Sequence, residues 1–167
     1  FEAKDTGKHS SYAMFTQLRH YVQVALNKGE PIPPFLAGHE TEKAAIMKSA
    51  DVIPLLKANN VSVVLSRIHR LPDLPDQQPQ AIYRLPAQLT QAGILTALSY
   101  EGDMEAMGTR NLGFLAGTAS AYGLNSSEAL NLITLNPAKI LGVDAQDGSL
   151  KVGKKACFFI SNGNALD

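Results

Sequence analysis

Residues 61–65 read Val61-Ser62-Val63-Val64-Leu65, and residues 94–99 read Ile94-Leu95-Thr96-Ala97-Leu98-Ser99. Short apolar runs of this kind are typical of strands buried on both faces of a parallel sheet. Between them lie a proline-rich loop over residues 67–85 and a short helix, which we expect to begin at Pro86 and end near Gly93. The order of these elements predicts an α/β fold of repeated βα units on a parallel sheet.

Helical patterns precede the two predicted strands. Residues 10–28 carry apolar side chains three and four positions apart, and a proline-rich connector follows at residues 30–34. Residues 40–59 show a second helical pattern, in which Pro54 predicts a kink or two shorter helices.

The chain after Arg110 is predicted to be mostly helical. Small apolar residues over 111–122 favour a closely packed helix. Asn125 or Ser126 is expected to cap a helix over 128–135, and a further short helix is expected to start at Asn136-Pro137 and end at Leu141-Gly142.

The last twenty residues predict β-structure. Residues 148–153 read as a turn, a strand and a turn, and the apolar run 156–161 reads as a third strand. On this interpretation Cys157 is a small buried side chain without a reactive role, and Phe158 and Phe159 belong to the core.

Composition limits the classes of function. The 167 residues are 45% apolar and 18% charged, which suffices for a domain with a real core. Lys+Arg 15 and Asp+Glu 15 cancel, so the long-range field of a generic nucleic-acid or anionic-membrane binder is absent. No apolar run reaches the roughly 18 residues of a transmembrane helix. We therefore expect a soluble protein with no nucleic acid and no membrane as partner; a cytoplasmic and a bacterial exported location both fit.

Two sets of motifs resemble a known family. The run Leu135-Asn136-Pro137-Ala138-Lys139-Ile140-Leu141-Gly142, followed by Gly148-Ser149-Leu150 and residues 153–160, resembles the C-terminal signature of the metal-dependent amidohydrolase superfamily. Upstream, the runs 64–67, 69–72, 101–107, 110–112 and 114–118 look like its imidazolonepropionase-related branch. The resemblance covers roughly residues 50–167, and residues 1–40 match much less clearly.

The resemblance implies a (β/α)8 TIM barrel that carries a small β-sandwich built from both chain ends. Such a barrel takes about 250 residues, so we expect this chain to supply only the C-terminal βα units and to be completed by more of the same chain or by another chain, as in a homo-oligomer. Its expected divisions are a helical segment and connector at 1–40, partial barrel units at 41–142, and the start of the C-terminal β-sandwich portion at 143–167.

The resemblance also implies hydrolysis of C–N or related non-peptide bonds, with one or two divalent metals, usually zinc, activating a water molecule. This sequence departs from the superfamily pattern in two respects. His9, His20, His39 and His69 include no pair two residues apart, so the H-x-H metal motif is absent, and the lysine that bridges metals has no identifiable counterpart.

The candidate catalytic carboxylates follow the second predicted strand. The superfamily places there an aspartate that binds metal and takes a proton from water, and Asp103 is our candidate for both roles. An alignment without a gap puts Glu101 at that position instead. The simpler alternative is that Glu101, Asp103 and Glu105 form a solvated acidic loop.

Three further residues are candidates. His69 follows the first predicted strand, where imidazole can ligate metal or bind substrate, and substrate binding is the favoured role. His39 is a candidate metal ligand of a preceding βα unit, the alternative being an ordinary polar residue near a helix start. Arg110 can pair with a substrate carboxylate or hold the acidic loop in place.

Two functions fit this sequence. The first is a hydrolase of the amidohydrolase superfamily, provided that the complete chain or a partner supplies the missing metal ligands. The second is a non-catalytic, truncated scaffold that acts as a binding or assembly module, which the absence of the H-x-H motif favours if the chain is whole. A third interpretation is that the sequence joins ordered pieces of a longer chain.

Overall fold

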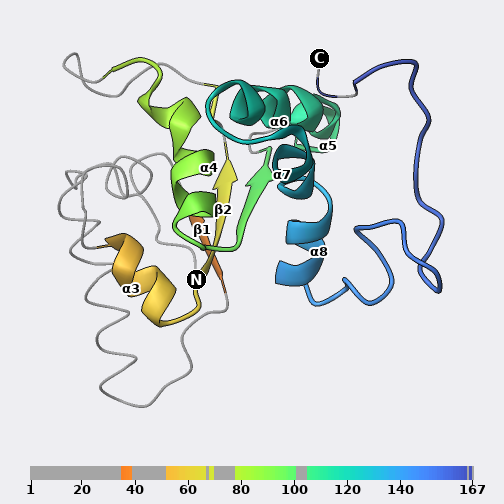
Figure 1. Ribbon diagram of the computed structural model, residues 1–167, viewed down its shortest axis with the longest axis horizontal. Helices are drawn as coiled ribbons and strands as arrows, with labels where there is room; N and C mark the ends of the chain where they lie inside the picture. The colour runs from red at the N-terminus through yellow and green to blue at the C-terminus, as the bar shows by residue number, and fades with distance from the viewer. Residues whose placement is uncertain are drawn as a thin grey trace.

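The computed structural model describes residues 35–38, 52–66, 68–69, 78–100, 105–164 and 166. Three strands form its sheet in the order β1-β2-β3 (Figure 1). They are β1 (Phe35–Gly38), β2 (Ser62–Ser66) and β3 (Thr96–Ser99). Both pairings are parallel, and Val64 of β2 lies between Ala37 of β1 and Ala97 of β3. The predicted parallel sheet, with strands at 61–65 and 94–99, is confirmed.

Helices connect the strands. Helix α3 (Val52–Ala58) precedes β2, and α4 (Ala81–Gln91) precedes β3. The remainder of the predicted helix 40–59 and the helix and connector within 1–34 lie outside the described residues. Pro54 lies in the first turn of α3, where its missing N–H leaves no intrahelical hydrogen bond unmade.

The two helix-to-strand junctions repeat one geometry. The N–H of Val61 donates to the carbonyl of Leu56 at 2.9 Å, and the N–H of Ile94 donates to that of Leu89 at 3.0 Å. In each case the preceding residue has a positive φ, 51° at Asn60 and 81° at Gly93. This is the Schellman type of helix end, and it turns the chain directly from the helix into the next strand.

Helix α4 begins earlier than the sequence predicts. It starts at Ala81, so Pro86 lies inside the helix and not in its first turn. Proline there removes one backbone hydrogen bond, but the Pro86 ring is fully buried, as are Leu85 and Leu89 on the same helix. Apolar burial of this face offsets the missing hydrogen bond.

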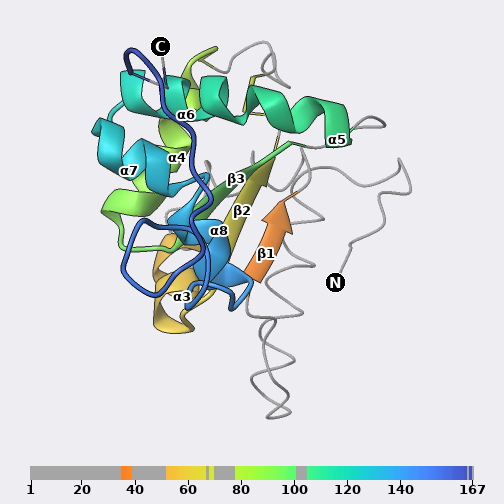
Figure 2. The same ribbon diagram turned by 90° about the vertical axis from the view of Figure 1, so that its right-hand side faces the viewer.

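The helices after β3 cover the carboxyl ends of the strands. Helix α5 (Glu105–Gly108), the 3-10 turn η1 (Thr109–Asn111) and α6 (Leu112–Ala121) follow one another, and Figure 2 shows α5 and α6 lying crosswise beyond those ends. Helix α7 (Ser126–Asn131) begins with a capping box in which Asn125 and Glu128 exchange hydrogen bonds. This confirms the predicted cap at Asn125.

The edge of β3 that faces away from β2 is bound by the next helical segment. The N–H of Leu98 donates to the carbonyl of Leu132 at 2.9 Å. The side-chain amide of Asn136, in α8 (Leu135–Ile140), donates to the carbonyl of Thr96 at 2.8 Å. Because Thr96 is fully buried, this hydrogen bond satisfies a carbonyl that water cannot reach.

One hydrophobic core joins the sheet to its helices. Its described members come from α3, β2, α4, β3, α6, α7 and the loops beside them, and the deepest large side chains are Val63, Leu65, Ile68, Leu85, Leu89 and Leu132. Leu166 returns to this core beside Gly117 of α6, where a Cβ would lie 2.3 Å from the carbonyl oxygen of Leu166. Within the described residues, no helix combines the length and the apolar character needed to span a bilayer.

The predicted strands of the last twenty residues are wrong for this structure. Residues 148–161 contain no strand, and Phe158 and Phe159 are 60% and 76% exposed. Cys157 is exposed, so its predicted burial is also wrong. An apolar run becomes a buried strand only beside a partner strand, and no described strand lies beside this one.

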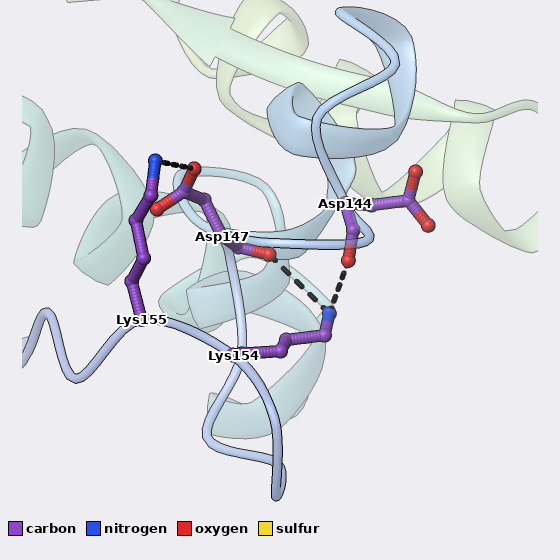
Figure 3. A network of polar contacts seen from close by, with 4 residues as sticks. All are labelled: Asp144, Asp147, Lys154 and Lys155. Atoms are coloured by element: carbon purple, nitrogen blue, oxygen red, sulfur yellow. Dashed lines mark hydrogen bonds and ion pairs between the residues drawn. The ribbon is translucent and has the colours of Figure 1, made fainter.

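A lysine organises the loop that follows α8. The ammonium of Lys154 donates to the carbonyl oxygens of Asp144 and Asp147 (Figure 3). It also donates to the hydroxyl of Ser149. The neighbouring Lys155 instead forms an ion pair with the Asp147 carboxylate at 3.2 Å, with the lysine side chain 59% exposed. The half-buried Lys154 therefore closes the loop, whereas Lys155 lies on its surface.

We expect Asn136→Ala to lower the free energy of unfolding by about 1–3 kcal/mol, because it leaves the buried Thr96 carbonyl without its donor. Lys139→Ala, an exposed change in the same helix, is the control and is expected to cost under about 1 kcal/mol. Urea unfolding followed by circular dichroism measures both. Equal losses would show that the hydrogen bond of Asn136 contributes nothing specific.

Lys154→Met and Lys155→Met form a second matched pair. We expect the first to cost about 1–3 kcal/mol, because three oxygen acceptors lose a charged donor. The second should cost well under about 1 kcal/mol, as is usual for an exposed ion pair. The midpoints of urea unfolding compare the two, and a larger loss for Lys155→Met would contradict the proposed closure of the loop by Lys154.

Candidate functional site

The carboxyl ends of three adjacent parallel strands define the candidate site. Gly38, the last residue of β1, pairs with Leu65, and Ser66, the last residue of β2, pairs with Ser99, the last of β3. The three strands therefore end level with one another to within one residue. In parallel α/β folds, ligands and catalytic groups gather at this edge.

All but one of the predicted site residues follow these strand ends closely in the sequence. His39 is the residue after β1, and His69 comes three residues after the end of β2 at Ser66. Glu101 and Asp103 come two and four residues after the end of β3 at Ser99. His39, Glu101 and Asp103 lie outside the described residues, so their predicted roles stay predictions.

His69 is described, and two helices hold its exposed side chain. Its Nε2 lies 2.5 Å from the hydroxyl oxygen of Thr118 in α6. Its ring meets that of Tyr83 in α4 edge to face, with the ring centroids 6.1 Å apart. Tyr83 in turn packs against Tyr122 at 5.2 Å, which ties the start of α4 to the end of α6.

Arg110 lies in η1 and is exposed. Among the described residues, no ion pair involves its guanidinium, and no hydrogen bond joins it to His69. Its predicted roles, pairing with a substrate carboxylate or with the acidic loop, both concern groups beyond the described part of the chain and remain predictions.

The residues on either side of the acidic stretch 101–104 pack against each other. A Cβ on Gly108, the last residue of α5, would lie 2.0 Å from Cδ1 of Tyr100. The Tyr100 ring therefore rests directly on the backbone of Gly108, and Tyr100 also packs against the core. This contact fixes the chain just before Glu101 relative to the end of α5.

The described residues do not by themselves form a metal site. No group of three His, Cys, Asp or Glu side chains among them is arranged to hold a cation. Imidazole and carboxylate are suitable zinc ligands, but of the predicted ligands His39 and Asp103 neither is described.

The sequence did not reveal the residues that hold His69. Thr118 lies 49 residues from His69, in a helix whose composition indicates only close packing. Tyr83 falls in a stretch predicted as a loop. A threonine among small apolar residues was the one available signal, and nothing in its spacing connects it with the histidine.

The fold described above, a parallel sheet with helices between its strands and polar residues after the strand ends, is that of an α/β protein with a candidate site at the carboxyl edge. The sequence profile of the amidohydrolase family matches residues 39–166, and the chain belongs to this family. Among curated proteins, none matches the chain in sequence.

A solved structure, an amidohydrolase from Thermotoga maritima, resembles the fold with a TM-score of 0.51. Its sequence is 19% identical, and the likeness covers 87% of this chain and 46% of the Thermotoga chain. The present chain thus spans about half the length of that relative.

We expect Gly108→Ala to displace the Tyr100 ring and to lower the free energy of unfolding by about 1–3 kcal/mol, as overpacking does. This loss would appear although alanine is intrinsically better than glycine in a helix. Gly163→Ala, where a Cβ meets no atom within 4 Å, is the control and should change stability by under about 0.5 kcal/mol. Chemical unfolding measures both; an unaffected Gly108→Ala would show that Tyr100 is free to move.

Proposed function

We propose that this protein is a hydrolase of the amidohydrolase family that cleaves C–N or related non-peptide bonds of a small molecule, and that it belongs to the imidazolonepropionase-related branch. The observation that carries the proposal is that three adjacent parallel strands end within one residue of one another in register. Each strand is followed within a few residues by a candidate site residue. The motifs at 64–72 and 101–118 support the branch.

The proposed roles follow from the chemistry of each side chain. Asp103 accepts the proton of the attacking water, and Glu101 is the alternative carboxylate for this role. His69 binds the substrate, and Arg110 pairs with a substrate carboxylate. A divalent metal, usually zinc in this superfamily, completes the proposed site, with His39 and Asp103 as its ligands from this chain.

The remainder of the proposed site comes from outside these three strands. A closed (β/α)8 barrel has eight strands, so we propose that further strands, from the same natural chain or from another copy, complete it. Residues 143–167 would then enter the small β-sandwich. The exposure of Phe158, Phe159 and Ile160 supports this proposal, because apolar residues of a sandwich strand need an opposing sheet.

A non-catalytic scaffold is the second candidate if the natural full-length protein also lacks an H-x-H pair, as the four histidines of this sequence do. Metal content separates the two candidates. Stoichiometric zinc in the natural full-length protein, together with turnover, supports the hydrolase; absence of both supports the scaffold.

Asp103→Asn in the natural full-length protein is expected to lower kcat at least about 100-fold, because asparagine cannot accept the proton of the attacking water. The assay follows acid release from a panel of cyclic amides and N-acyl compounds, and circular dichroism checks that the fold is kept. Glu101→Gln is the matched control and should retain most activity. If only Glu101→Gln is inactive, the roles are exchanged; if both variants are active, neither carboxylate is the base.

A further inference from the structure

We propose that Thr118 is a positioning residue that holds His69 with its proton on Nε2 and so presents Nδ1, as a hydrogen-bond acceptor, to the substrate. The inference rests on the proposed function in one respect, namely that His69 binds the substrate. Its structural part concerns which ring nitrogen carries the proton, and that part depends only on the contacts of the described residues.

The proton on Nε2 follows from counting hydrogens. The hydroxyl of Thr118 donates to the carbonyl of Phe114, one turn earlier in α6, at 3.0 Å. A hydroxyl has one proton, so with that proton directed at Phe114 the oxygen can only accept from a second partner. That partner is Nε2 of His69 at 2.5 Å, and we therefore assign the ring proton to this nitrogen.

Thr118 is held in place by its helix, so its hydrogen bond to His69 can orient the imidazole ring. Thr118 lies inside α6, and its neighbour Ala119 is fully buried. The hydroxyl is tied to its own helix by the bond to Phe114, so the acceptor is fixed in place. The edge-to-face contact with the ring of Tyr83 also limits how far the imidazole ring can rotate.

This arrangement leaves Nδ1 as the nitrogen with a free lone pair. None of the hydrogen bonds among the described residues uses it. In the neutral imidazole the unprotonated nitrogen can only accept. The substrate group that meets His69 is therefore a donor, an amide or ring N–H or a hydroxyl, whereas a substrate carboxylate is left for Arg110.

The test is nitrogen NMR of the natural full-length protein labelled with 15N in its histidines, at about pH 8, where imidazoles are mostly neutral. The His69 signals are assigned by their loss in His69→Gln. We expect Nε2 to show the shift of a protonated nitrogen and Nδ1 that of an unprotonated one. A protonated Nδ1 in the natural protein would overturn the proposal without any variant.

Two substitutions separate positioning from packing. Thr118→Val keeps the shape and removes the hydroxyl, so the ratio of the two tautomers should shift by about fivefold, as expected for loss of one ordinary hydrogen bond. Thr118→Ser keeps the hydroxyl and should retain the natural spectrum. If Thr118→Val leaves the ratio unchanged, Thr118 does not set the tautomer.

The substrate side is tested with paired probes from the panel of cyclic amides, each with a free N–H and with an N-methyl group in its place. We expect N-methylation to raise KM at least about fivefold in the natural protein and to matter less in Thr118→Val. Equal KM values for both members of each pair would refute the donor assignment. If no compound is hydrolysed, the proposed function fails, and the NMR result still decides the role of Thr118.

Discussion

Parallel pairing of β2 on both of its edges is the constraint on which the rest of the structure depends. Ser62, Val63, Leu65 and Ser66 are all buried, which requires cover on both faces of the strand as well as a neighbour on each side. Parallel neighbours need a long crossover connection, which is usually a helix, and α3 and α4 lie in these connections. The same register makes the strands end together, and it is this level edge that brings residues distant in sequence to one place.

The family signature after residue 134 is explained by packing of the scaffold. Asn136 binds the free edge of β3 through Thr96, and Lys154 closes the following loop. Gly148 has φ +83°, and a Cβ there would lie 2.6 Å from the Cβ of Ala138, so the loop can fold against α8 only with glycine at this position. These residues contact backbone and neighbouring side chains of the scaffold, which indicates that they preserve the fold.

The structural features that the sequence predicts correctly are those that depend on residues close together along the chain. The strands at 62–66 and 96–99 and the cap at Asn125 depend on apolar runs and on neighbours three residues apart. Two predictions failed because the local structure depends on contacts with distant parts of the chain. Burial allows α4 to begin five residues before Pro86, and the run 156–161 forms no strand because no described strand lies beside it. At the site, the position of His69 after β2 could be predicted, but its partner Thr118, 49 residues away, could not.

The contacts of His69 favour a directing role over a stabilising one. Its side chain is exposed, and a neutral hydrogen bond at an exposed position contributes only about 1 kcal/mol to folding. The helix already satisfies the Thr118 hydroxyl through Phe114, so the histidine is not needed to pair a buried group. The contact with Thr118 instead determines which ring nitrogen of His69 remains available as an acceptor. Together with the contact to Tyr83, it sets the orientation of the ring. Fixed orientation is of little use to stability at the edge of a sheet, but it is what a substrate-binding imidazole requires.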